Sequence, residues 1–428
     1  MYFIISIILV IITLILLYLA TKNIFSFSFF TGVILTLTFI GTVLVTEYPH
    51  YPLSFYFSLG IISYGFGVFF ANLFRRFSPR RELNRFRELK ISSPFKFNTP
   101  FSLAFIFLVI LNILAVVFLF YKSGVPLFQE ITEAAKIEIA FGSNWILVRS
   151  LRIFLPILLF ILSLYMVKTK KFLTKLGFIS LLFLMTIIYL FYGFKGYFLG
   201  YLAIPLLTLW ALVKEIKIRD IILLFLLSSV VALPLIGKML STPNLIEISK
   251  FILNRFTVIQ AEGIDYIVNN LVPEEGFFRG LTFKMDIAGL LYKVGVLKEE
   301  SLNFNAFLVE HKTGSNPQGR IQIASTLFGE FYANFGLLGG VLAAFIGGFL
   351  LQLLYIKAIR SSKNIFFLPL IISIQGAFSG AIISGHTLIT LIDVGIMTLF
   401  ILFLLLVGYA FFSLPSGQVV FLKRKPIS

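Results

Sequence analysis

The sequence predicts an all-α fold: a polytopic transmembrane helical bundle with one large polar loop late in the chain. Hydrophobic residues make up 59% of the chain and charged residues only 13%, whereas soluble domains are about 25% charged. The mean hydropathy is +0.99. Apolar runs of about 20 residues, each able to cross a hydrocarbon core of about 30 Å, recur along the whole chain. Residues 1–428 are therefore expected to form a single integral membrane domain.

The apolar runs predict about eleven spans, each long enough to cross a bilayer. They lie near residues 2–20, 24–45, 53–74, 101–121, 151–167, 177–193, 197–213, 221–240, 335–356, 365–385 and 388–412. The first run lacks a basic segment before it and a small-x-small cleavage site after it. We therefore expect it to be a retained helix and not a cleaved signal peptide.

The basic residues are distributed in a way that predicts the topology. The net charge is +17, and Lys and Arg concentrate in alternate connections, most densely in residues 75–98. Since cytoplasmic loops carry the excess of positive charge, this pattern predicts a cell-membrane protein with its N-terminus outside and its C-terminus in the cytoplasm. We expect the basic runs to set topology or to contact anionic lipid headgroups, with no nucleic acid as a partner.

The large extracytoplasmic loop is predicted at residues 241–335, between spans eight and nine, with amphipathic helices inside it. Residues 252–272 have helical periodicity. On this helix Arg255, Glu262, Asp265 and Asn269 share one face. That face could line an outer cavity, and the alternative is the solvated face of a surface helix.

The end of this loop brings a cation and a carboxylate to the start of a span. If a helix runs from residue 320 to residue 335, then Arg320, Glu330 and Asn334 lie on one face. A charge that enters a membrane helix is costly and usually points into a cavity, which favours a functional role. The alternative is a local ion pair that anchors the loop.

Further cations are predicted on the outer side, where positive charge is in the minority. They are Arg149, Arg152, Lys195 and Arg279. Guanidinium groups bind phosphate oxygens in a bidentate manner, so such a cluster could hold a diphosphate. Each of these residues could instead anchor its helix at the membrane interface.

Several kinds of chemistry are disfavoured by the sequence. There is no cysteine, and the three histidines (His50, His311 and His386) are scattered without metal-ligand spacing. No D-x-D pair, Walker motif or G-x-G-x-x-G fingerprint occurs. We therefore expect no metal and no cofactor. Asp393 lies within the last span, either as a packed hydrogen-bonding group or as part of a pathway.

Two motifs resemble those of the oligosaccharide repeat-unit polymerases, the O-antigen polymerase family. The first is the short outer turn Tyr192-Gly-Phe-Lys-Gly196, where the family commonly has Arg-Gly. The second is Gly329-Glu-Phe-Tyr-Ala-Asn-Phe-Gly-Leu-Leu-Gly-Gly340, which leads from the long loop into a span. The number of spans and the late outer loop are also similar to the family layout.

The resemblance implies a glycosyltransferase that polymerises polyprenyl-diphosphate-linked oligosaccharide repeat units into a surface polysaccharide at the outer face of the membrane. In that chemistry outer cations stabilise the departing diphosphate, and a carboxylate or histidine activates the acceptor hydroxyl. The expected catalytic residues are Arg320, Glu330, Arg279, Asp265 and His311. The expected diphosphate-binding residues are Arg149, Arg152, Lys195 and Arg255. Membrane lipids, a flippase and a chain-length regulator are expected as partners.

Three other functions remain open on the sequence alone. A lipid-linked oligosaccharide flippase or other transporter would place its charges along a central path. A ligase, which transfers finished glycan to a lipid or protein, would share the fold and the cations. A structural or signalling membrane protein would need neither a central path of charges nor a group of outer cations.

Overall fold

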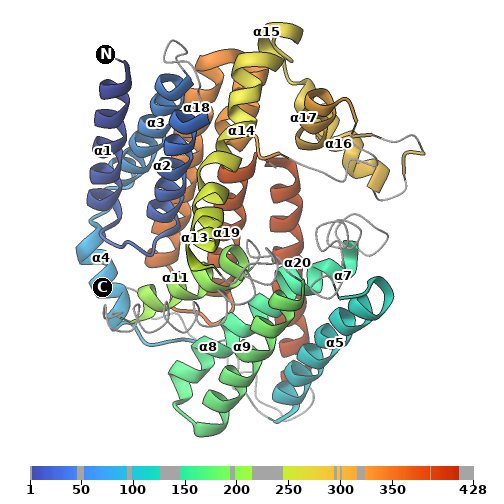
Figure 1. Cartoon of the computed structure of the whole chain (residues 1–428). Coiled ribbons are helices and arrows are strands. Elements are labelled where there is room, and N and C mark those ends of the chain that lie inside the picture. Colours follow the sequence, from blue (N-terminus) through green and yellow to red (C-terminus); the bar gives the residue numbers. More distant parts are fainter. Residues whose placement is uncertain are drawn as a thin grey trace.

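The protein is an all-α helical bundle in the part of the chain that the structure describes (Figure 1). The structure is a computed structural model. It describes residues 2–45, 53–93, 99–125, 145–192, 198–214, 244–293, 296–298, 301–315, 323–385 and 387–413. Within these residues no strand is present, and the β-geometry is limited to one bridge between Ser92 and Asn364.

Nine helical segments in these residues are long and apolar enough to cross a membrane. They comprise α1 (Tyr2–Thr21), α2 (Phe27–Val45), α3 (Leu53–Phe74), α5 (Thr99–Ser123), α7 to α8 (Trp145–Thr169), α9 (Phe172–Tyr192), α18 (Thr326–Arg360), α19 (Phe367–Ser384) and α20 (Thr387–Ser413). The span predicted at 197–213 is a shorter apolar helix, made of the π-helix η3 (Phe198–Ala203) and α11 (Ile204–Val213). The span predicted at 221–240 lies outside the described residues.

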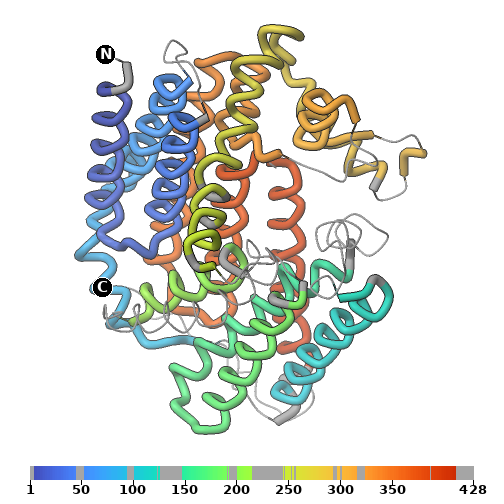
Figure 2. The backbone as a smooth tube through the Cα atoms, viewed as in Figure 1, coloured from blue at the N-terminus to red at the C-terminus, as the bar shows by residue number. Residues whose placement is uncertain are grey.

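Small residues bring α1, α2, α3 and α18 together on one side of the bundle (Figure 2). A Cβ atom at Gly32 of α2 would collide with Leu17 of α1, and one at Gly67 of α3 would collide with the carbonyl of Phe345 in α18. In membranes, such small residues allow backbones to approach closely and gain dispersion contacts. Tyr64 lies fully buried among these helices and donates its hydroxyl to the carbonyl of Ser28.

The helix α18 is folded back on itself at Gly336. This glycine has φ 70° and ψ −163°, a conformation that is essentially restricted to glycine. A Cβ at Gly347 would lie 3.0 Å from the side chain of Leu327, twenty positions earlier. Residues 326–335 therefore form a half-helix of about 15 Å, which runs against residues 337–360 in a hairpin with its apex at Gly336.

The predicted outer loop is more deeply integrated in the bundle than the sequence suggested. A nearly continuous helical rod comprises α13 (Leu245–Phe256), α14 (Val258–Tyr266), the π-helix η4 (Ile267–Leu271) and α15 (Val272–Glu275). The rod runs alongside α2 in Figure 1. This contact is close because Gly41 of α2 faces the backbone of Thr257. On the rod, Gly263 likewise allows close approach to the carbonyl of Ala324, just before α18.

Two further helices of this segment, α16 (Leu281–Lys293) and α17 (Phe304–Thr313), lie beside the upper end of the rod in Figure 1. The N-termini of both α1 and α3 are at this upper side. We refer to it as the upper side and to the opposite one, which carries α4 (Pro79–Glu88), as the lower side. The sequence predicts that the upper side is extracytoplasmic.

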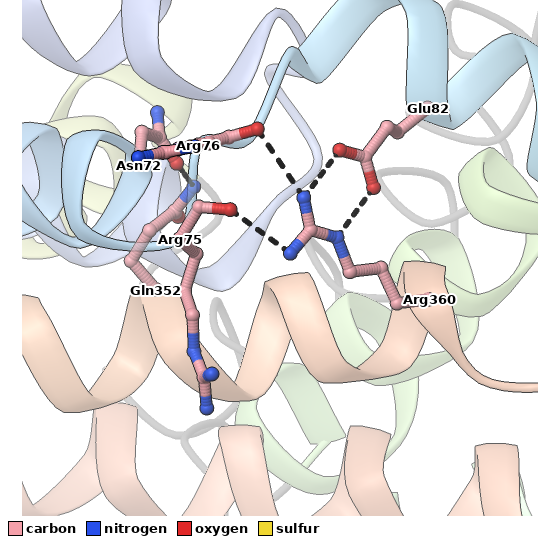
Figure 3. A network of polar contacts seen from close by, with 6 residues as sticks. All are labelled: Asn72, Arg75, Arg76, Glu82, Gln352 and Arg360. Carbon is pink, nitrogen blue, oxygen red and sulfur yellow. Dashed lines mark hydrogen bonds and ion pairs between the residues drawn. The ribbon is translucent and has the colours of Figure 1, made fainter.

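The lower side is tied together by arginine and lysine side chains (Figure 3). Arg360, at the end of α18, binds both carboxylate oxygens of Glu82 on α4, each at 2.6 Å, and also donates to the carbonyls of Arg75 and Arg76. A buried bond from Gln352 to Asn72 lies next to this network. The basic segment 75–93 is thus folded onto the bundle, with Leu83 and Phe86 of α4 buried.

Candidate functional site

A buried ion pair joins the first turns of two apolar spans. Arg149 is the last residue of α7 (Trp145–Arg149), and its Nη2 lies 2.9 Å from Oδ1 of Asp393 on α20. The two residues are only 9% and 3% exposed. Ionisable groups within spans are costly to bury and are retained mainly where they serve a function. Asp393, for which the sequence left two roles open, is thus the ion-pair partner of this arginine.

A second arginine, Arg152, lies one turn further along the same span, in the π-helix η2 (Ser150–Phe154). Its Nη2 donates to the hydroxyl of Tyr201 at 3.0 Å, and its guanidinium carbon lies 5.2 Å from the centre of that ring. Tyr201 is itself in the π-helix η3. Since π-helical turns frequently occur at functional sites, the contact between two of them favours a functional role for these residues. We call Arg149, Arg152, Tyr201 and Asp393 the arginine cluster.

An apolar groove of about 500 Å³ lies between α5, η2 and α20, the last two of which also carry residues of the arginine cluster. Its walls include the side chains of Leu111, Phe118, Phe154 and Phe403. Two polar residues, Asn112 and Ser150, also line it, and Ser150 directly follows Arg149 in the chain. The groove therefore offers an apolar surface whose lining residues Ser150 and Phe154 flank Arg152 in the chain, while neither arginine is itself a lining residue.

A separate polar cluster lies at the upper end of the rod, where α17 packs against α14. Nδ1 of His311 is hydrogen-bonded to the hydroxyl of Tyr266 at 2.6 Å, and its Nε2 lies 3.3 Å from Oε1 of Glu275. The side chain of His311 is 20% exposed. A histidine held between a carboxylate and a hydroxyl has the arrangement of an oriented general base. We call these three residues the histidine cluster.

Asp265 adjoins the histidine cluster, because it directly precedes Tyr266. Its Oδ1 accepts a hydrogen bond from Asn269 at 2.7 Å. Burial raises the pKa of Asp265, and the hydrogen bond from Asn269 and the charge of Lys312 partly counteract that effect. Lys312 also lies 3.7 Å from Glu262. The structure thus brings together two of the expected catalytic residues, Asp265 and His311.

Glu330 lies on the half-helix of α18 and is fully enclosed, with 0% exposure. Its Oε2 accepts a hydrogen bond from the hydroxyl of Thr387, at the start of α20, at 3.2 Å. Its Oε1 has no hydrogen-bond partner among the described residues. The carboxyl group also interacts electrostatically with Asp286 of α16. Glu330 is therefore a buried group between three helices, not a surface base.

Arg279 lies at the apex of the α18 hairpin and is exposed. Its backbone N–H donates to the carbonyl of Asn334, and the side chain of Asn334 accepts from the N–H of Gly280 at 2.7 Å. Arg279 has φ 49°, a left-handed conformation that is uncommon for a residue with a side chain. These bonds cap the carbonyls at the end of the half-helix and hold Arg279 at the upper surface.

One premise of the sequence prediction is wrong. The helix that contains Glu330 begins at Thr326, and residues 323–325 precede it without helical structure. Arg320 therefore does not share a continuous helical face with Glu330 and Asn334. The hydroxyl of Thr326 accepts a hydrogen bond from the N–H of Gly329, as the side chain of a helix-capping residue does. This bond favours a helix that begins at Thr326 over one that begins earlier in the chain.

Several of the residues expected from the sequence lie outside the part of the chain that the structure describes. Arg320 and Lys195 lie outside the described residues, as do His50 and His386, and the side chain of Arg255 is not described either. Sequence reasoning did not select Tyr201, Tyr266, Glu275 or Asp393 as site residues. Of these, only Asp393 carried a signal, namely a carboxylate inside a span. Among the described residues no group of three or more potential ligands could hold a metal ion.

Comparisons with known proteins do not identify a family for this chain. No protein-family model, no curated protein and no solved structure matches the chain.

Proposed function

We propose that this protein is a glycosyltransferase that polymerises polyprenyl-diphosphate-linked oligosaccharide units at the outer face of the cell membrane, with its upper side extracytoplasmic. The observation that carries the proposal is the apolar groove between α5 and α20, two of whose lining residues, Ser150 and Phe154, belong to the same turns of η2 as the arginine cluster. A lipid-linked donor has the matching chemistry, because a long apolar chain joins a diphosphate to a sugar.

The arginine cluster would receive the diphosphate. A guanidinium group has five N–H donors, so Arg149 can hold Asp393 and a phosphate together. In a site with few waters, such fixed positive charges stabilise the negative charge that develops on the leaving group. The apolar chain would lie in the groove, where each buried methylene contributes about 0.8 kcal/mol.

The histidine cluster would serve the acceptor sugar. Nδ1 of His311 would take the proton from the acceptor hydroxyl, which would replace the Tyr266 hydroxyl as its hydrogen-bond partner, while Glu275 accepts from Nε2 and stabilises the resulting imidazolium. The acceptor oxygen would form a bond to the anomeric carbon of the donor as the bond from that carbon to the diphosphate breaks. Glu330 was expected to be the first candidate for this base. Because its carboxyl group is enclosed, we assign the role of general base to His311.

A second candidate function is the transport of lipid-linked oligosaccharide across the membrane. The half-helix hairpin of α18 favours it, since discontinuous helices are a common feature of transporters. A ligase with the same fold would use the same groove and cations as the polymerase, and only its acceptor would differ.

The test replaces cluster residues in cells that depend on this chain for a surface glycan, with the glycan length examined on a gel. For Arg152→Gln we expect loss of the length ladder with single repeat units retained. His311→Gln should give the same pattern, because it removes the base. Arg75→Gln, a lower-side control whose backbone carbonyl alone binds Arg360, should keep the ladder.

Other outcomes separate the alternatives. Accumulation of lipid-linked units on the cytoplasmic side would favour the transporter. A full ladder that fails to reach its final acceptor would favour the ligase. Full ladders in the Arg152 and His311 variants, at unchanged protein levels in the membrane, would refute the site assignment.

A further inference from the structure

The helix α4 on the lower side presents two different faces. Leu83 and Phe86 on one face are buried against the bundle, and Glu82 binds Arg360 through both of its carboxylate oxygens. The opposite face is exposed and carries three arginines: Arg80, Arg81 and Arg85. At about 3.6 residues per turn, these three side chains fall within an arc of about 140°. We call them the α4 arginine face.

The orientation of α4 is fixed by hydrogen bonds on its inner side. Nη2 of Arg87 donates to the carbonyl of Ala211 in α11 at 2.9 Å, and Nζ of Lys363 donates to the carbonyl of Arg87 at 2.7 Å. The two bonds between Arg360 and Glu82 add a third attachment, to the end of α18 (Figure 3). Because α4 cannot rotate without breaking these bonds, the α4 arginine face is held outwards.

The positive charge of the α4 arginine face is not balanced within α4. This helix contains two acids, and one of them, Glu82, is already bound to Arg360. The other, Glu88, is exposed and leaves one carboxylate for three guanidinium groups. The ion pairs among the described residues include none of these three arginines. An anionic partner would therefore meet an excess of positive charge in a fixed arrangement.

The α4 arginine face also lies close to the end of an apolar span. Leu73 and Phe74, the last residues of α3, are 59% and 63% exposed. Pro79 follows Phe74 by five residues, which bridge at most about 18 Å even in an extended chain. Leu89, directly after α4, is 44% exposed as well. Apolar surface beside arginines suits a phospholipid, in which acyl chains adjoin a phosphate, better than a nucleic acid or an acidic protein.

We propose that the α4 arginine face binds the headgroups of anionic phospholipids in the membrane leaflet at the lower side. Each guanidinium group can hold phosphate oxygens in a bidentate manner. The sequence left open whether the basic segment sets the topology or contacts lipid. A topology signal acts through its charge during insertion, whereas the folded chain keeps these arginines in one outward orientation. Lipid binding at this face does not depend on glycosyl transfer and would be present in a transporter as well.

The test is the thermal unfolding of the purified, delipidated full chain in detergent, titrated with phosphatidylglycerol or phosphatidylcholine. Phosphatidylglycerol should raise Tm in a saturable manner, because a ligand that binds the folded state stabilises it. Phosphatidylcholine, which has no net charge, should have no such effect at equal concentration. Glycerol phosphate and polyglutamate should have none either, because they lack acyl chains. An equal rise with glycerol phosphate would overturn the proposal in favour of a soluble phosphate, and one with polyglutamate in favour of an acidic protein.

A double variant isolates the α4 arginine face. Arg81→Gln with Arg85→Gln should raise the half-saturating concentration of phosphatidylglycerol about 25-fold, since each basic residue at an anionic surface contributes a factor of about five. Without lipid this variant should unfold within about 2 °C of the wild type, because both side chains are exposed. Lys284→Gln with Lys298→Gln removes two exposed charges outside α4. It is the matched control and should respond like the wild type.

Two results would refute lipid binding at this face. One is an unchanged wild-type Tm in phosphatidylglycerol, and the other is a wild-type response in the arginine double variant. If the double variant does not fold, an unaltered half-saturating concentration in Arg81→Gln alone would do the same.

Discussion

The hairpin of α18 can be tested with a disulfide between Leu327→Cys and Gly347→Cys. In a straight helix these positions would be about 30 Å apart, since each residue adds about 1.5 Å. In the hairpin an added Cβ at Gly347 is 3.0 Å from the Leu327 side chain, and the substitution of Leu327 frees the space that a sulfur needs. The chain has no cysteine of its own, so it gives no background.

The assay is mild oxidation in isolated membranes, followed by denaturation and labelling of the remaining free thiols with a maleimide-polyethylene glycol that shifts the band on a gel. Without reductant the disulfide-bonded chain should not shift, and after reduction both cysteines should be labelled. The control pair, Leu338→Cys with Gly347→Cys, lies on the same arm about 14 Å apart and should not form a bond. Equal cross-linking in both pairs, or none in the first, would refute the hairpin.

Three further predictions follow from the same structure. Gly336→Ala should lower the free energy of unfolding by about 2–4 kcal/mol. The alanine would have to adopt a conformation restricted to glycine, and its Cβ would lie 3.1 Å from the ring of Phe277. Gly380→Ala in α19, with no atom within 4 Å of the new Cβ, is the control and should not lower Tm. Asp393→Asn should destabilise the chain by about 3–5 kcal/mol because it removes the carboxylate that the buried Arg149 binds, and a Tm equal to that of the wild type would contradict the ion pair. Burial lowers the pKa of Lys363 to about 8 from 10.5, so its neutral form is favoured by folding. Stability should therefore rise between about pH 8 and pH 10.5 by about 3 kcal/mol. Thermal unfolding of the wild type and Lys363→Met at both ends of this range should show the rise in the wild type only.

The sequence was sufficient to predict the nine spans found among the described residues, because hydrophobic length alone identifies them, but it also predicted a span at 197–213, where the structure has a shorter apolar helix. It could not predict the half-helix, since residues 326–360 are apolar on both sides of Gly336 and have the composition of one long span. Whether these residues form one straight helix or a hairpin depends on the backbone conformation of Gly336 and on the packing of Phe328 against α3 and Gly340.

The candidate site was predictable only where a charge stood out against an apolar background. Arg149 and Arg152 could be selected because they begin a span, but their partners Asp393 and Tyr201 come from distant helices. His311 and Asp265 could be named individually. Their proximity depends on how α17 packs on α14, which no local pattern encodes. The helix from residue 320 to residue 335 was only assumed, and Ser325-Thr326 is a pair that can itself begin a helix, as it does here.

The lower side of the bundle has a consequence for biogenesis. Arg87 donates to the carbonyl of Ala211, and Lys363 to that of Arg87, so this face joins segments made early, midway and late in synthesis. The side-chain oxygen of Asn72 accepts from Gln352, 280 positions later, whereas its amide nitrogen donates to the carbonyl of Ala20 in α1. Until residue 352 has been translated and inserted, this buried oxygen of α3 lacks the partner that it has in the folded chain. A chain truncated before α18 lacks these late contacts and should be directed to degradation.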